Sequence, residues 1–318
     1  MNTLPFRTLS SWFREQTGQP IRKVPLDNGA TCPNRDGSIG RGGCLFCSVP
    51  SFSPIAGGGR GILGREKAEP LSPEDLTCAF ERLALSMTRG KARLFLPYLN
   101  GYTPTNLPLE ILAPQLRALT QHPLSAGAAL CTRPDMVSDE LIDFLSSLVK
   151  SGYLIMVELG LQSCDDALLR RMGRGHSVRD FTDTASRLGN IGVHTCAHLI
   201  FGLPGQSMEN MIESTMVAAG PQGCHGVKFH NFHICRGTIM DEMMKQEPWP
   251  LMTLEEYART VAKAVSLVSP NTVVHRLCAS IGREHLSAPQ WAADAPAIRN
   301  RIMELLQEMH IQNTTSHT

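Results

Sequence analysis

The sequence has no run of 18 apolar residues, and its charges nearly cancel. Without such a run, no membrane-spanning helix is expected. The formal net charge of +1 at pH 7 gives no broad basic field that would attract nucleic acid, although a local basic patch could still bind it. The N-terminal segment has no continuous apolar stretch, so it does not read as a signal peptide. These absences predict a cytoplasmic protein with no membrane partner.

Disulfide bonds are also not expected, because ten cysteines without a signal peptide indicate a reducing compartment. Metal or cluster binding then explains a closely spaced set of cysteines better than crosslinking does. The three closely spaced cysteines are Cys32, Cys44 and Cys47. The others are isolated, and most are expected to be small buried side chains, at positions 78, 131, 164, 196, 224, 235 and 278.

The middle of the chain alternates between strand and helix patterns. A chain of 318 residues with 42% apolar and 19% charged residues is an ordinary globular chain, long enough for one barrel or two smaller domains. The alternation predicts an α/β fold with a parallel sheet, either a (β/α) barrel or a doubly wound sheet, with chemistry at the C-terminal ends of the strands. The predicted strands cover 92–99, 125–132, 153–162, 193–204 and 226–234.

The C-terminal part follows with a helix, a strand and a second helix. This segment is expected to pack on the barrel or to close it. The predicted elements cover 253–268, 272–277 and 296–309.

The cysteine loop at 32–47 reads CPNRDGSIGRGGCLFC. A structural zinc site usually has four ligands, but the closest histidine in sequence is the distant His122, and no fourth cysteine lies nearby. Three local thiols also suit an iron–sulfur cluster with one iron left open, and the glycines at 40, 42 and 43 would let the loop fold tightly around it. Spacing alone leaves zinc and a cluster about equally favoured.

Six blocks in order resemble the YhcC-like radical S-adenosylmethionine (radical SAM) proteins, which are relatives of the Elp3-like enzymes. The first gap of eleven residues is longer than the usual C-x3-C-x2-C spacing of the superfamily, but it is the form of this subfamily. The blocks are the cysteine loop, TRPD (132–135), VELGLQS (157–163), MGRGH (172–176), HLIFGLPG (198–205) and KFHNFHICRGT (228–238).

The resemblance implies a partial (β/α)6 TIM-like barrel with a core at 1–240 and an extension at 241–318. It also implies that Cys32, Cys44 and Cys47 hold a [4Fe-4S] cluster whose fourth iron is ligated by S-adenosylmethionine (SAM). An electron donor such as flavodoxin or ferredoxin would then drive cleavage of SAM to a 5′-deoxyadenosyl radical for hydrogen abstraction. Phe46 stands where the family keeps an aromatic residue close to the adenine.

Two polar residues match SAM contacts of related barrel enzymes of the coproporphyrinogen type. Gln162 and Arg174 stand twelve residues apart, as in those enzymes, and a guanidinium fork suits the SAM carboxylate. Glu158 shares the strand face of Gln162, because the two are four residues apart. We expect Glu158 either to contact the cofactor or to be a buried acid paired with an arginine.

Two further positions depart from the pattern of the relatives. His198 stands where they place an aspartate near the SAM ribose, so its role is open. The segment LPYLNGY lacks the acid of a Gly-Gly-Glu type segment, which pairs with the SAM amino group. Asn100, Tyr98 or a backbone carbonyl is expected to substitute for that acid.

The other histidines give weaker signals. His194 and Cys196 share a strand face with His198 by the two-residue period. His230 and His233 are three apart and fall on opposite faces of a regular strand, so they are poor candidates for a joint metal site.

The substrate is the main gap. Kinship with Elp3-like proteins suggests modification of wobble uridine in tRNA, and a few basic residues in the early loops could meet phosphates. A small molecule or a peptide is the alternative substrate, and a non-catalytic zinc or Fe-S binding protein is the alternative class. The basic residues are Arg41, Arg60, Arg65 and Lys67.

Overall fold

The structure is a computed structural model that describes residues 4–48, 67–87 and 94–315. Its centre is an eight-stranded sheet in the order β1-β9-β7-β6-β5-β4-β3-β2, in which each neighbouring pair is parallel. The bounds are β1 Arg7–Thr8, β2 Ile21–Leu26, β3 Leu94–Leu99, β4 Gly127–Thr132, β5 Leu154–Gln162, β6 His194–Phe201, β7 Gly226–Asn231 and β9 Val273–Arg276.

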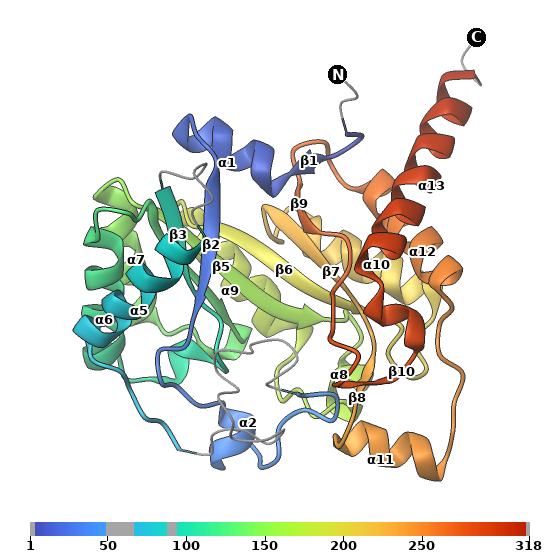
Figure 1. Ribbon diagram of the computed structural model, residues 1–318, viewed down its shortest axis with the longest axis horizontal. Helices are drawn as coiled ribbons and strands as arrows, with labels where there is room; N and C mark the ends of the chain where they lie inside the picture. Colours follow the sequence, from blue (N-terminus) through green and yellow to red (C-terminus); the bar gives the residue numbers. More distant parts are fainter. Residues whose placement is uncertain (1–3, 49–66, 88–93, 316–318) are drawn as a thin grey trace.

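The strands from β2 to β7 lie side by side in chain order, so the connections all step the same way around the sheet. A doubly wound sheet would reverse its strand order at a switch point, and this sheet has no such reversal. The curled sheet with its helices on the outside confirms the expected partial barrel (Figure 1). Among the described residues, the helices are α1 Leu9–Thr17, α2 Pro33–Asp36, α5 Pro73–Ser86, α6 Leu109–Gln121, α7 Asp139–Lys150, α8 Asp166–Arg171, α9 Val178–Asn190, α10 Met208–Ala219, α11 Ile239–Gln246, α12 Leu254–Leu267 and α13 Ala295–Thr315.

Local sequence explains where the outer helices begin. Ser72 and Ser138 accept hydrogen bonds from the backbone N–H groups of the third helical residues, Asp75 and Leu141, as N-cap residues do. The inner faces of these helices then bury leucine and phenylalanine side chains against the sheet in the main apolar core.

The strand β2 was not predicted from the sequence. Its segment, IRKVPL, contains a proline and two charged residues, which blur the strand pattern. Pro25 is tolerated there because β2 lies at an edge of the sheet and pairs only with β3. The strand matters for the site because it carries Lys23 into the barrel.

The C-terminal region adds a strand to the barrel. β9 hydrogen-bonds to β7 on one side and to β1 on the other, so a segment beyond residue 240 is built into the sheet. A second, two-stranded sheet pairs β8, Ile234–Cys235, with β10, Leu286–Ala288. The domain boundary at residue 240 stays a prediction.

The helix α1 closes the barrel at the N-terminal ends of the strands (Figure 1). Its residues Trp12 and Phe13 are buried among side chains from five strands. The ring of Trp12 packs on the imidazole of His194 with the ring centroids 3.9 Å apart. The interior apolar residues that surround the two aromatic rings are Ile21, Leu96, Ala129, Met156 and Val273.

Two buried histidines lie next to this closure. Nε2 of His194 is 3.0 Å from Nε2 of His275, and the two rings are nearly parallel. Burial lowers the pKa of His194 to about 2, and the neighbouring rings of His275 and His225 add to this effect. Burial likewise lowers the pKa of His275 to about 4, although the Glu158 carboxylate acts in the opposite direction. Both rings are therefore neutral at pH 7, and one donates to the other.

This pair predicts acid sensitivity of the fold. His194 stays unprotonated in the folded chain and gains a proton in the unfolded chain below the ordinary pKa of about 6.5. The contribution of neutral His194 to the stability of the fold is thus fully present above pH 6.5 and is lost as the pH falls. In the wild type, His194 should make the free energy of unfolding fall by about 1.4 kcal/mol per pH unit between pH 6 and 5. We expect His194→Gln to lack this part of the fall. Urea unfolding at several pH values measures this slope.

The matched control is His310→Gln, which changes an exposed histidine on α13. The slope measured for that variant is the reference for the slope of His194→Gln. Equal slopes for the wild type and His194→Gln would show that His194 does not stay neutral in the folded chain.

Candidate functional site

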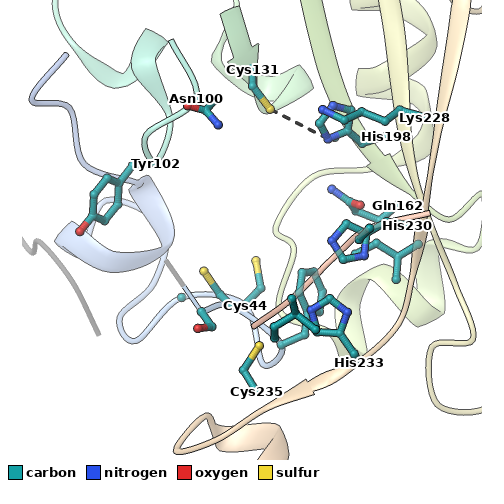
Figure 2. Close-up of a pocket in the computed structure, with 18 of the residues that line it drawn as sticks. Cys44, Asn100, Tyr102, Cys131, Gln162, His198, Lys228, His230, His233 and Cys235 are labelled. Carbon is teal, nitrogen blue, oxygen red and sulfur yellow. Dashed lines mark hydrogen bonds between the residues drawn. The ribbon is translucent and has the colours of Figure 1, made fainter. Parts of the chain in front are cut away.

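A cavity of about 1040 Å³ opens at the C-terminal ends of the strands and extends into the barrel. Side chains from β2 to β7, from β9 and from the cysteine loop line it (Figure 2). Eight of the nine residues predicted for the site line this cavity. These residues are Cys32, Phe46, Cys44, Cys47, Gln162, Arg174, His198 and Asn100.

The cysteine loop folds tightly at the mouth of the cavity. Cys32 is the N-cap of the short helix α2, and the N–H of Cys47 donates to the carbonyl of Cys44. Gly42 and Gly43 have φ angles of 83° and 87°, in the left-handed region that glycine adopts without strain. A Cβ at Gly43 would also lie 3.0 Å from the guanidinium of Arg35. Of the three glycines predicted to let the loop turn, Gly42 and Gly43 therefore serve that purpose.

Donor groups converge on two of the thiols. Nη1 of Arg174 lies 3.4 Å from Sγ of Cys44, and Nδ2 of Asn34 lies 3.3 Å from the same sulfur. Nη2 of Arg35 donates to Sγ of Cys47 over 3.1 Å. Cationic donors of this kind stabilise thiolates, which are the form that binds metal.

The thiol pKa values reflect these neighbours. Burial alone would raise the pKa of Cys44, but Arg174 and the hydrogen bonds from Arg174 and Asn34 bring it below its ordinary value. Burial dominates at Cys47 and raises its pKa to about 11, in spite of Arg35. The negative charge of the nearby Cys44 thiolate adds to this rise.

The distances between the three cysteine sulfurs indicate how large a bound group the site can hold. The three sulfur atoms do not all lie within 4.8 Å of one another. Three ligands at 2.3 Å from one tetrahedral zinc ion would lie about 3.8 Å apart. The sulfurs are thus more widely spaced than one zinc ion requires, and the donor set fits a larger thiolate-bound cluster.

Gln162 ends β5 in an unusual backbone conformation. Its φ of 71° is rare for a residue other than glycine, and the register with β6 is irregular between Leu159 and Gln162. Such strain persists where surrounding structure enforces it, and it is frequent at functional sites. The bend aims the side chain of Gln162 into the cavity (Figure 2).

Arg174 is buried and held on three sides. Besides Cys44, its guanidinium donates to the carbonyl of Gly160 over 3.2 Å and to Nε2 of His176 over 3.2 Å. Burial and the cations Arg174 and Arg133 lower the pKa of His176 to about 2, so that ring is a neutral acceptor. A Cβ at Gly160 would lie 2.9 Å from Nη2 of Arg174 and 2.7 Å from Nε2 of Gln162, so a larger residue there would displace the ends of these two side chains.

Asn100 has an unused acceptor. Its Oδ1 atom is buried and has no hydrogen-bond partner among the described residues. Tyr98, the other side chain considered for the missing acid, already donates to Oε2 of Glu158 over 2.6 Å. Of the two, Asn100 is therefore better suited to receive an ammonium group.

Glu158 is fully buried behind the cavity wall and does not line the cavity. Its carboxylate forms ion pairs with Lys23 and with Lys228, the latter at 2.7 Å, rather than with an arginine. Oε2 of Glu158 also lies 2.6 Å from Nε2 of His198. Burial opposes ionisation, but Lys228, Lys23 and His198 hold the pKa of Glu158 well below its ordinary value.

Both rings of the pair His230 and His233 line the cavity, and they stack with centroids 5.1 Å apart. Opposite faces were expected for a regular strand, but β7 ends at Asn231, so the two-residue period does not apply at position 233. His230 remains on the strand, and His233 follows a bend in the chain.

Several cavity residues were missed by sequence reasoning. Lys23 and Arg276 lie in strands with little pattern, and Lys228 begins the quoted block KFHNFHICRGT without having been singled out. Cys131 and Cys235, both treated as isolated cysteines, also line the cavity. For the two lysines, the sequence offered one signal of a place in the cavity, namely a strand position that faces the barrel interior.

The basic residues of the early loops are only partly described. Arg41 and Lys67 are exposed. Arg60, Arg65 and the glycine-rich stretch at 56–61 lie outside the described residues.

Comparison with protein families agrees with this site. The model of the radical SAM superfamily matches residues 37–216, and the model of the radical SAM C-terminal domain matches residues 224–308. The chain belongs to the radical SAM superfamily. Members of this superfamily use a [4Fe-4S] cluster and SAM and need a reductant, so the chain is a radical SAM enzyme.

Individual relatives support the same assignment. Protein YhcC of Escherichia coli is 33% identical over 274 residues, which cover 86% of this chain and 83% of YhcC, and places the chain among the YhcC-like proteins. A tRNA uridine(34) acetyltransferase of Dehalococcoides mccartyi is 28% identical over 193 residues, covering 58% of this chain and 39% of that protein.

Among solved structures, the Elp3 protein of Methanocaldococcus infernus matches with a TM-score of 0.58 and 21% identity. The match covers 76% of this chain and 59% of Elp3, and at this identity it shows the common fold alone. In the described part of the chain, no helix is both long and apolar enough to cross a membrane.

Proposed function

We propose that Cys32, Cys44 and Cys47 hold the [4Fe-4S] cluster and that the adjoining cavity wall binds SAM. When bound and reduced, these cofactors supply a 5′-deoxyadenosyl radical that abstracts a hydrogen atom. The observation that carries the proposal is the 3.4 Å contact between Arg174 and the sulfur of Cys44, because it joins the cysteine loop to the predicted carboxylate clamp.

In this proposal each wall residue has a distinct task toward SAM. Arg174 would bind the carboxylate, with Gln162 beside it, and Asn100 would accept a hydrogen bond from the amino group through its unpartnered oxygen. Phe46 would offer an apolar face to the adenine. The neutral ring of His198, whose pKa is lowered to about 3 by burial and by Lys228, would donate or accept without adding charge near the ribose.

Glu158 takes a different part in the proposal from the one expected from the sequence. Because its carboxylate is enclosed by Lys23, Lys228 and His198, it has no free face toward a cofactor. It would instead fix the side chain of His198 through their 2.6 Å hydrogen bond. We therefore treat Glu158 as a positioning residue.

The cluster assignment predicts the iron content of the protein. Anaerobically reconstituted wild type should carry about four irons, and Cys44→Ala should lose nearly all of them, because thiolates are the proposed ligands. Iron and sulfide assays with absorption spectra measure the difference. Cys78→Ala is the matched control, because that exposed cysteine lies on the outer helix α5. Stoichiometric zinc without iron in the anaerobic wild type would overturn the assignment.

The clamp assignment predicts a separate loss in Arg174→Ala. The variant should keep its iron but bind SAM about ten- to hundredfold more weakly, because a hydrogen bond to a charged group is worth about 1.5–3 kcal/mol. Equilibrium dialysis with SAM measures the affinity, and slow formation of 5′-deoxyadenosine measures cleavage. Because Arg174 also contacts Cys44, Arg174→Lys is the second variant and should keep the sulfur contact. Unaltered SAM affinity in both variants would refute the clamp.

For the substrate, we propose modification of a wobble uridine in tRNA. The support is the relation to the tRNA uridine(34) acetyltransferase, together with the exposed basic residues Arg41 and Lys67 at the early loops. That relation covers 39% of the acetyltransferase, so it supports the class of substrate and not the reaction. A small molecule or a peptide is the alternative, favoured by the near-neutral net charge.

This proposal predicts salt-sensitive tRNA binding. Affinity should fall steeply as salt rises, because basic side chains that contact phosphates release counterions. Arg41→Gln should weaken binding of all tRNAs, whereas Lys150→Gln on α7, on the outside of the barrel, should not. Mass spectrometry of tRNA nucleosides from a deletion strain, with complementation, identifies the modified base. Unchanged nucleosides combined with no binding at low salt would remove tRNA as the substrate.

A further inference from the structure

We infer that the inner end of the cavity binds an anionic group of the substrate, a carboxylate or a phosphate, through Arg276, Lys228 and Lys23. The inference deepens the proposed function, on which it rests, because it takes the cavity to be the reaction chamber. It adds a recognition site away from the cysteine loop.

The charges at this end of the cavity do not balance. Lys23 enters from β2, Lys228 from β7 and Arg276 from β9, and all three line the cavity. Glu158 is the one carboxylate in contact with the two lysines among the described residues. Three cations and one carboxylate leave two positive charges in a largely buried space. Removing such charges from water is costly unless an anion compensates them.

Within the described residues, the Nε atom of Arg276 has no hydrogen-bond partner. No ion pair is recorded for its guanidinium within the described part of the chain, and its Nε atom is buried without a hydrogen-bond partner. A buried donor left unsatisfied costs about 1–3 kcal/mol, so a ligand oxygen at this position would be stabilising. The planar guanidinium also suits the two oxygens of a carboxylate or phosphate.

The lowered pKa values of the surrounding histidines are consistent with a positive field at this end of the cavity. Burial lowers the pKa of His230 well below its ordinary value, and Arg276 and His233 add to the effect. Burial also lowers the pKa of His198, and Lys228 is the next largest cause. These rings are neutral at pH 7, so they do not add to the charge and can serve as hydrogen-bond donors to an anion.

The proposed anion site is separate from the proposed SAM carboxylate clamp. Lys228, His198 and Cys131 lie at one end of the group of drawn side chains, and Cys44 and Cys235 lie at the other end (Figure 2). Arg174, the clamp, contacts Cys44 and so belongs to the cysteine end. Arg276 pairs in register with Lys228 on the neighbouring strand, so it belongs to the end that Lys228 marks.

A cation is a poor occupant of the same space. Ligand atoms of Cys131, Glu158 and His198 lie within 4.8 Å of one another, which alone would permit a metal ion. The Glu158 carboxylate, however, already receives the ammonium groups of Lys23 and Lys228. These ammonium groups would repel a divalent cation and block the carboxylate oxygens. Among the described residues that line the cavity, the one acid is Glu284, whose side chain is 71% exposed.

The test measures anion binding to the cluster-loaded protein with SAM present, so that the clamp is filled. The probes are propionate, inorganic phosphate and neutral propionamide, each titrated calorimetrically at constant ionic strength set with sodium chloride. We expect propionate or phosphate to bind and propionamide not to bind. Arg276→Gln should weaken anion binding ten- to hundredfold, while Arg276→Lys, which keeps the charge, should retain most of it.

Lys150→Gln is the matched control for a lost surface charge and should bind as the wild type does. Binding of propionate alone indicates a carboxylate substrate, and binding of phosphate alone indicates a phosphorylated one. Equal binding of propionamide, or equal anion affinity in wild type and Arg276→Gln, would overturn the inference. Failure of the proposed function is a different result, namely no 5′-deoxyadenosine from the wild type, so the two failures are distinguishable.

Discussion

The carboxylate of Glu158 is the interaction around which the barrel interior is arranged. It is fully buried on β5 and reaches Lys23 on β2, Tyr98 on β3 and Lys228 on β7. An ion group of this kind spans the inside of the curled sheet, where backbone hydrogen bonds cannot connect opposite strands. Removing one partner of a buried ion pair typically costs about 3–5 kcal/mol, because the remaining charges lose their counter-charge. Glu158 therefore fixes the positions of residues that face the cavity.

Below this ion group, the barrel is closed by apolar and aromatic packing rather than by more charge. Trp12 and Phe13 fill the space at the N-terminal ends of the strands, and the neutral pair His194 and His275 lies between them and Glu158. The closure excludes water from that side, which strengthens every charge interaction above it. The cavity thus faces the cysteine loop and the C-terminal ends of the strands.

The cavity consequently has two electrostatically different ends. At the cysteine end, Arg174 and Arg35 face thiols, so their positive charges have partners that become anionic when a cluster is bound. At the inner end, the described cations outnumber the one described carboxylate, Glu158, and the Nε atom of Arg276 has no hydrogen-bond partner among these residues. A reaction chamber built in this way can hold a cofactor at one end and orient a charged substrate at the other. The C-terminal strand β9 supplies Arg276, so the extension contributes to the cavity as well as to the sheet.

The sequence by itself determined the alternation of strands and helices and the cysteine loop. These features are written in local patterns, because apolar periodicity, N-cap serines and close cysteine spacing act over a few residues. Gln162 and Arg174 were located in the sequence by its resemblance to related radical SAM enzymes, and both line the cavity. Only the tertiary structure decided the partners of Glu158, the shared face of His230 and His233, and the meeting of Lys23, Lys228 and Arg276. Those three cations come from residues 23, 228 and 276, on strands with no common local pattern, and only the curl of the sheet brings them together. Charge compensation inside a barrel depends on distances between strands far apart in the chain, and a linear pattern carries no record of them.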